Sequence, residues 1–125
     1  MMSISNQKIS EARLQYELVQ WLQLNKILAI HCPNGEERNI KVAMKLTAMG
    51  VRAGVPDLMI PLPDGKILWI ELKLAKGKLS KPQVKMIELL ESLNHQVLVV
   101  YADSLLEAKE ILIPELSKTF LLVSL

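Results

Sequence analysis

The sequence predicts a mixed α/β domain in which a central sheet is flanked by helices. Segments whose apolar residues recur at helical spacing alternate with apolar segments of strand length, and turn-forming residues separate them. The segment 66–74 is apolar on both faces, which predicts a strand in the interior of a sheet. A chain of 125 residues, half of them hydrophobic, can form one core, so we expect a single domain over residues 1–125.

Local signals give the order of the elements. Leu14, Leu18, Trp21 and Leu22 recur at helical spacing and indicate the first helix. Turn and cap residues divide the rest of the chain: Pro33-Asn34-Gly35, Gly50, Pro63-Asp64-Gly65, and Ser80 followed by Pro82. The expected elements are helices over 10–25, 38–49, 80–94 and 104–113, and strands over 27–32, 57–62, 66–74, 96–101 and, at the end of the chain, 119–123.

Composition excludes several classes of protein. The longest apolar stretches are of strand length and far shorter than the roughly 20 residues of a membrane-spanning helix. The first ten residues are polar and lack the apolar core of a secretion signal. The single cysteine cannot form an intramolecular disulfide, and there is no Cys/His cluster typical of zinc sites. We therefore expect a cytoplasmic protein with no membrane partner.

Charge is unevenly distributed although the net charge is only +2. Residues 38–56 carry four basic side chains and no carboxylate, and residues 72–87 carry five lysines and no carboxylate. Acidic residues predominate after position 87. This separation suits a protein that lays one face on phosphates, although an ordinary solvated surface explains it equally well.

Two charged residues end the apolar strand 66–74. Glu71 and Lys73 share one face and lie about 7 Å apart along an extended chain. Such charges are costly in a covered strand unless they are paired or bind a ligand. If the hairpin turn places Leu62 opposite Lys66, Asp57 falls opposite Glu71. Two carboxylates suit Mg²⁺ or Mn²⁺, and the lysine could orient or deprotonate a water molecule or neutralise charge on a phosphate, as phosphodiester hydrolysis requires.

The first helix offers a further acid. At 100° per residue, Glu11 lies within the apolar stripe of Leu14, Leu18 and Leu22, whereas Glu17 falls to its side. We therefore expect Glu11 to point toward the core and to join the site. An exposed residue in the first helical turn, favoured by the helix dipole, is an equally consistent interpretation.

These residues resemble a known family. Gly54-Val55-Pro56-Asp57-Leu58 followed by Ile70-Glu71-Leu72-Lys73 resembles the signature of PD-(D/E)xK nucleases. The surrounding blocks are similar to the VRR-NUC branch: Glu11-x-x-x-Gln15 before Trp21, Pro33-Asn34-Gly35, Gly50-Val51-x-x-Gly54, and Leu79-Ser80-x-x-Gln83. A bare PD…ExK pattern recurs by chance, but these blocks in this order cover residues 10–112 and make the resemblance specific.

The resemblance implies a restriction-endonuclease-like fold and a site for Mg²⁺ or Mn²⁺. It implies metal ligation by Asp57, Glu71 and the backbone carbonyl of Leu72, assisted by Glu11. Lys73 matches the catalytic lysine, and Gln83 matches a residue near the active site on the following helix, so the catalytic set is Lys73, Asp57, Glu71, Glu11 and Gln83.

The resemblance also implies a substrate and an assembly. Short stand-alone members resemble homodimeric Holliday-junction resolvases of phages and bacteria, whereas members fused to DNA-binding regions cut flaps. We therefore expect a structure-selective DNA endonuclease that acts as a homodimer on four-way junctions. A flap or single-strand nuclease, a catalytically silent DNA-binding module, and an unrelated domain with a structural ion-pair network remain alternatives.

Other residues have a functional and a structural interpretation. The candidate DNA contacts are Lys76, Lys78, Lys81, Lys85, Arg52 and Asn34, each of which could also be a solvated surface or turn residue. We expect structural roles for His31 and His95 and core positions for Cys32 and the tryptophans. The methionines, Met44 and Met49 among them, could line a dimer face or fill the core, and we favour the core.

Overall fold

The computed structural model describes residues 9–33 and 39–125. In this part of the chain, one sheet has the order β1-β2-β3-β4. The strands are β1 (Ile30–His31), β2 (Leu58–Pro61), β3 (Ile67–Lys73) and β4 (Gln96–Tyr101). The sheet is mixed, because β2 pairs antiparallel with both β1 and β3 while β3 pairs parallel with β4. The expected α/β architecture and the interior position of β3 are confirmed.

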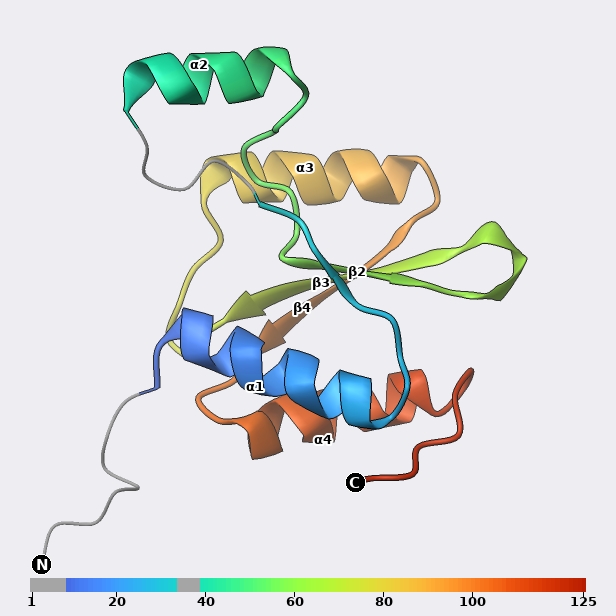
Figure 1. The fold of residues 1–125 in the computed structure, drawn as a ribbon. Helices are drawn as coiled ribbons and strands as arrows, with labels where there is room; N and C mark the ends of the chain where they lie inside the picture. Colours follow the sequence, from blue (N-terminus) through green and yellow to red (C-terminus); the bar gives the residue numbers. More distant parts are fainter. Residues whose placement is uncertain (1–8, 34–38) are drawn as a thin grey trace, which may run out of the picture.

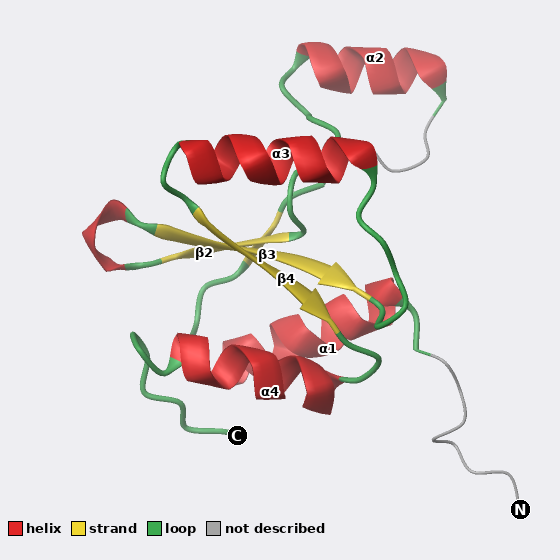
Figure 2. Cartoon of the chain, turned by 180° about the vertical axis from the view of Figure 1, so that it is seen from behind, coloured by secondary structure: helices red, strands yellow, loops and turns green. Residues whose placement is uncertain are grey.

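Helices cover both faces of the sheet (Figure 1). The helices α1 (Glu11–Leu24) and α4 (Leu105–Leu116) lie side by side on one face, and α3 (Lys81–Ser92) lies on the other, as the view from behind also shows (Figure 2). The helix α2 (Ile40–Ala48) lies beyond α3, away from the sheet. None of the described helices is long and apolar enough to cross a membrane.

The hydrophobic core lies between the sheet and the α1/α4 layer. Leucines of α1 and α4 pack there against the side chains that β2 and β3 project toward them, among them Leu58, Ile60, Leu68, Ile70 and Leu72. Among the described helices, α3 covers the opposite face of β3, and Ile87 is its one buried residue. Glu71 is on this second face, and its neighbours Trp69 and Lys73 are half-buried. The charged end of β3 therefore lies outside the main core.

Helix α2 has no buried residue. Asn39 caps it, because its side chain accepts a hydrogen bond from the Val42 N–H at 2.9 Å. Ile40 is 77% exposed and Met44 is 67% exposed. A core position was therefore the wrong prediction for Met44, and also for Met49, which is exposed after the helix. Contacts within the described chain leave this apolar helix uncovered.

The structure corrects both ends of the predicted strand pattern. The first strand, expected over 27–32, pairs only at Ile30–His31, since Ile27 is buried against α1 and its N–H bonds the Leu22 carbonyl. The expected strand over 119–123 is absent from the described structure. Helix α4 continues past the expected end at residue 113 to Leu116, and the chain then folds back so that Val123 and Ser124 reach Asn25 at the end of α1.

The C-terminal segment is held by side chains rather than by a strand partner. The buried Asn25 accepts the Val123 and Ser124 N–H groups at 2.8 and 2.9 Å, and its amide donates to the Ser124 carbonyl. Trp21 Nε1 donates to the same carbonyl at 2.9 Å. These bonds satisfy the backbone groups that a sheet would otherwise have paired.

Candidate active site

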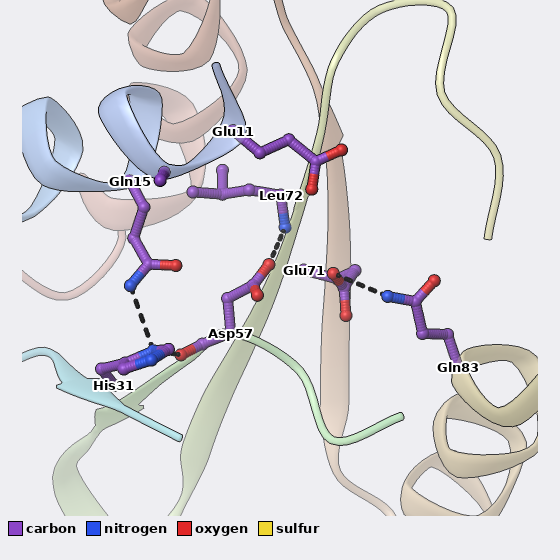
Figure 3. Close-up of a pocket in the computed structure, with 8 residues that line it drawn as sticks. Glu11, Gln15, His31, Asp57, Glu71, Leu72 and Gln83 are labelled. Carbon is purple, nitrogen blue, oxygen red and sulfur yellow. Dashed lines mark hydrogen bonds between the residues drawn. The ribbon is translucent and has the colours of Figure 1, made fainter. Parts of the chain in front are cut away.

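A cleft opens where β3 ends, β2 begins, and α1 and α3 present their first turns (Figure 3). Its volume is about 320 Å³. It is lined by Glu11, Ala12, Gln15, His31, Asp57, Glu71, Leu72 and Gln83. Four of the five residues expected to be catalytic therefore lie together, although they come from four separate segments of the chain.

The β2–β3 hairpin brings the first two acids together. Leu58 pairs with Ile70, and one further step along both strands places Asp57 opposite Glu71. At the other end, the Leu62 N–H donates to the Lys66 carbonyl at 2.8 Å, so the assumed register is confirmed. The Leu72 N–H donates to Asp57 Oδ2 at 2.7 Å and holds this carboxylate beside the end of β3 (Figure 3).

Glu71 is the unusual group of the cleft, with 1% of its surface exposed. Its Oε1 atom is buried and has no hydrogen-bond partner among the described residues. Burial raises the pKa of Glu71 to about 9, and hydrogen bonding to Asp57 and repulsion by its carboxylate add to this increase. The Lys73 ammonium opposes the increase in the Glu71 pKa. An acid with a buried, unpaired oxygen is costly to the fold, which indicates a function.

Gln83 reaches Glu71 because the first turn of α3 orients its amide. Ser80 caps the helix: its hydroxyl accepts the Gln83 N–H, and its own N–H donates to Gln83 Oε1 at 2.8 Å. With the oxygen so engaged, Gln83 Nε2 faces Glu71 Oε2 at 3.4 Å. The spacing Leu79-Ser80-x-x-Gln83 thus has a local physical reason.

Gly54 allows the preceding loop to approach α3. Its φ is +84°, and a Cβ atom at this position would overlap the carbonyl of Pro82. Only glycine satisfies both the backbone conformation and the contact. The loop that leads into Asp57 therefore packs on the helix turn that carries Gln83.

The donors of the cleft fit a hard divalent cation. In residues 9–33 and 39–125, no group of three or more His, Cys, Asp and Glu side chains forms a metal site. Asp57 and Glu71 are a pair of carboxylates, which is the number that Mg²⁺ commonly takes from a protein while it keeps several water molecules. The unpaired Glu71 Oε1 is suited to such a role. The contribution of the Leu72 carbonyl remains a prediction.

Glu11 occupies the rim of the cleft. It is exposed rather than directed into the core, so the prediction of an inward-facing side chain was wrong. It nevertheless lines the cleft with Asp57 and Glu71, because α1 begins at the rim of the cleft. Glu17 instead forms a salt bridge with Arg13 at 2.9 Å.

Lys73 is half-buried on the same face of β3 as Glu71. It is not among the residues that line the cleft, and its Nζ makes no salt bridge with any described residue. Its charge still acts on Glu71, as the lowering effect on the Glu71 pKa shows.

The candidate DNA contacts form two groups beside the cleft. Arg52, Lys81 and Lys85 line a hollow of about 500 Å³ between the segment 47–53 and the first turns of α3. Lys76 and Lys78 are exposed on the loop that joins β3 to α3. Asn34 lies outside the described residues.

Two lining residues were not expected in the site. His31 was predicted to be structural, and Gln15 was named in a sequence block without being assigned to the site. The available signal for His31 was its position at the end of the strand that precedes the Pro33-Asn34-Gly35 block. Cys32, expected in the core, is half-buried beside it.

Comparisons with known proteins identify the family of the chain. The family model described as "VRR-NUC domain" matches residues 3–104. A protein of Acyrthosiphon pisum secondary endosymbiont phage 1, named "Putative nuclease p44", is 38% identical over 64 residues, which are 51% of this chain and 68% of the phage protein.

Two solved structures share the fold. A "VRR_NUC domain protein" has a TM-score of 0.68 and 20% identity, covering 89% of this chain and 91% of that chain. A second, "VRR_NUC domain", has a TM-score of 0.56 and 23% identity, covering 83% of this chain and 94% of that chain. With the family match over most of its length, the chain belongs to the VRR-NUC family of the PD-(D/E)xK nuclease superfamily.

Proposed function

We propose that this nuclease domain is a structure-selective DNA endonuclease that uses Mg²⁺ or Mn²⁺ bound at Asp57 and Glu71. The observation that carries the proposal is the pair formed by Asp57 and the buried Glu71, whose Oε1 has no partner among the described residues. Carboxylate oxygens are the ligands these cations prefer. The alternative of a structural ion-pair network is disfavoured, because neither described salt bridge involves these acids.

The chain supplies distinct groups for phosphodiester hydrolysis. When bound, the cation would provide an activated water molecule and neutralise charge on the attacked phosphate. Asp57, Glu71 and the Leu72 carbonyl would hold it, with Glu11 at the rim. Lys73 would orient or deprotonate the attacking water or stabilise charge on the phosphate. Gln83 keeps one oxygen of Glu71 in place through its amide.

The test compares labelled four-way junction, flap and linear duplex DNA, each incubated with Mg²⁺ or Mn²⁺ and with a chelator. We expect metal-dependent, symmetrical paired nicks in the junction and loss of cleavage in Asp57→Asn. Faster cleavage of flaps would support the flap nuclease instead. If the folded, metal-loaded protein binds junctions but cuts none of these substrates, the silent DNA-binding module is the better account.

The basic residues beside the cleft should bind the DNA backbone. Replacing both Lys81 and Lys85 by alanine is expected to weaken junction binding and to reduce the slope of log K against log salt by about 2, since each phosphate contact contributes about 0.9. Fluorescence anisotropy between low and moderate salt measures this slope. Replacing Lys109 and Lys118, which belong to the acidic part of the chain, is the matched control and should leave the slope unchanged.

We further propose that the protein acts on junctions as a homodimer, because two active sites are needed to cut two strands. The exposed apolar face of α2, with Ile40 and Met44 one turn apart, supports a second copy as its partner.

Introducing a charge into this face should separate the subunits. Met44→Glu is expected to shift the protein from dimer to monomer in light scattering and to uncouple the two nicks in the junction. Leu106→Glu, at an exposed apolar position of α4 on the other side of the sheet, is the control. A monomeric wild-type protein would contradict the dimer.

A further inference from the structure

His31 connects three elements at the cleft. It belongs to β1, and its Nδ1 atom lies 3.0 Å from the carbonyl oxygen of Asp57, at the start of β2. The same Nδ1 lies 3.0 Å from the side-chain amide of Gln15 on α1. Figure 3 shows the ring between the Gln15 amide and the backbone carbonyl of Asp57, whose carboxylate is directed toward Leu72.

The chemistry of the ring nitrogen determines how these contacts work. A carbonyl oxygen only accepts hydrogen bonds, so a protonated Nδ1 donates to Asp57. In the other tautomer, Nδ1 accepts a hydrogen bond from the Gln15 Nε2–H group. The same ring nitrogen therefore serves both partners, and the tautomer decides which of the two contacts is the hydrogen bond.

The backbone of Asp57 is held from two directions. Its carbonyl accepts the Cys32 N–H at 2.9 Å as well as the His31 contact. Its carboxylate accepts the Leu72 N–H. The orientation of this acid therefore depends on β1 and β3 together.

Gln15 extends the link to the helix-borne acid. Gln15 and Glu11 are four residues apart on α1 and both line the cleft. Among the described residues, the Gln15–His31 contact is the one side-chain hydrogen bond that joins α1 to a strand. The buried Leu14, Leu18 and Leu22 place α1 against the sheet, and this contact adds a polar link between the helix and the strand end beside Asp57.

We propose that His31 and Gln15 are positioning residues that hold the start of β2, and with it Asp57, against α1, and so raise the affinity of the site for the divalent cation. This inference rests on the metal site of the proposed function. It places neither residue in contact with the reacting phosphate. Outer hydrogen bonds of this kind typically change metal affinity by about 10- to 100-fold.

The test measures Mn²⁺ affinity by titration calorimetry at fixed pH, and cleavage as a function of Mn²⁺ concentration. We expect His31→Leu and Gln15→Met each to weaken Mn²⁺ binding by about tenfold. Saturating Mn²⁺ should restore kcat to within about threefold of wild type, and the KM for DNA should be unchanged. The double variant should be no weaker than the worse single variant, because both substitutions remove the same link.

Two further variants separate positioning from simple packing. His31→Asn keeps an N–H near the position of Nδ1 and should retain Mn²⁺ affinity within about threefold of wild type. Gln23→Met makes the same substitution as Gln15→Met at an exposed site of α1 and should have no effect. If His31→Leu does not fold, Gln15→Met and His31→Asn still test the proposal.

The outcomes are distinguishable. Folded His31→Leu and Gln15→Met proteins that bind Mn²⁺ as tightly as wild type would overturn the positioning role while leaving the nuclease proposal intact. A wild-type protein that binds no Mn²⁺ would overturn the metal site, and the positioning role with it. Loss of stability in these variants without loss of Mn²⁺ affinity would show that the contacts only maintain the fold.

Discussion

Replacing Lys73 by alanine is expected to lower the rate of junction cleavage by about 10³-fold while leaving junction binding within about threefold of wild type. The expected loss of cleavage follows from the position of Lys73. Lys73 follows Glu71 on the same face of β3, and its charge acts on that carboxylate. A group that stabilises charge or moves a proton in the transition state affects kcat far more than substrate binding.

Single-turnover cleavage with saturating metal, together with anisotropy of labelled junctions, measures both quantities. Lys66→Ala is the matched control, because Lys66 precedes β3 and is exposed at the opposite end of the same strand. The control should cut at the wild-type rate. An active Lys73→Ala protein would show that another group performs this step, whereas a large loss of binding would place Lys73 among the DNA contacts.

Replacing Glu71 by glutamine should abolish cleavage, by about 10³-fold or more, and at the same time stabilise the metal-free protein. The amide preserves the size of the side chain and needs no proton uptake on folding, whereas burial and Asp57 force Glu71 to take up a proton at neutral pH. At neutral pH we expect the melting temperature in chelator to rise by several degrees, which corresponds to about 1–3 kcal/mol. The same substitution should weaken Mn²⁺ binding.

The sign of the pH dependence follows from the direction of the pKa shift. The folded protein retains a proton on Glu71 that the unfolded chain releases between the ordinary value of 4.5 and about 9. The unfolded state therefore binds fewer protons in this window, and the free energy of unfolding of the metal-free protein falls as pH rises through it. Bound Mn²⁺ should oppose this loss, since it favours the ionised carboxylate.

Thermal denaturation in chelator between pH 5 and pH 8.5 measures this effect. The wild-type protein should lose stability across the range relative to Glu71→Gln, and Mn²⁺ should stabilise only the wild type. Glu91→Gln, which changes an exposed carboxylate of α3, is the control. Equal pH profiles for wild type and Glu71→Gln would mean that Glu71 is ionised in the metal-free fold.

Much of the site was predictable because it depends on local geometry. The turn Pro63-Asp64-Gly65 joins two short strands, so the register that places Asp57 opposite Glu71 follows from turn length. The capping residue Ser80 and Pro82 mark the start of α3, and this start orients Gln83. The apolar residues of 66–74 on both faces predicted an interior strand for the same reason: side-chain alternation along a strand is a property of the backbone.

Contacts between segments distant in sequence were not predictable. The partners of His31 lie 16 and 26 residues away, and nothing in the neighbourhood of His31 indicates them. The C-terminal segment has strand-like composition, yet Asn25 and Trp21, about a hundred residues earlier, provide its hydrogen bonds. A residue pattern shows which groups need partners and leaves the choice among competing partners open.

The sequence by itself determined the α/β class, the hairpin register, the pairing of Asp57 with Glu71 and membership of the VRR-NUC family, because each depends on neighbours in the chain or on ordered blocks of residues. The tertiary structure alone decided that Glu11 lies at the rim, that His31 and Gln15 join the cleft, and that α2 remains uncovered. These features result from how whole elements pack, and packing depends on the summed burial of many side chains rather than on any local signal.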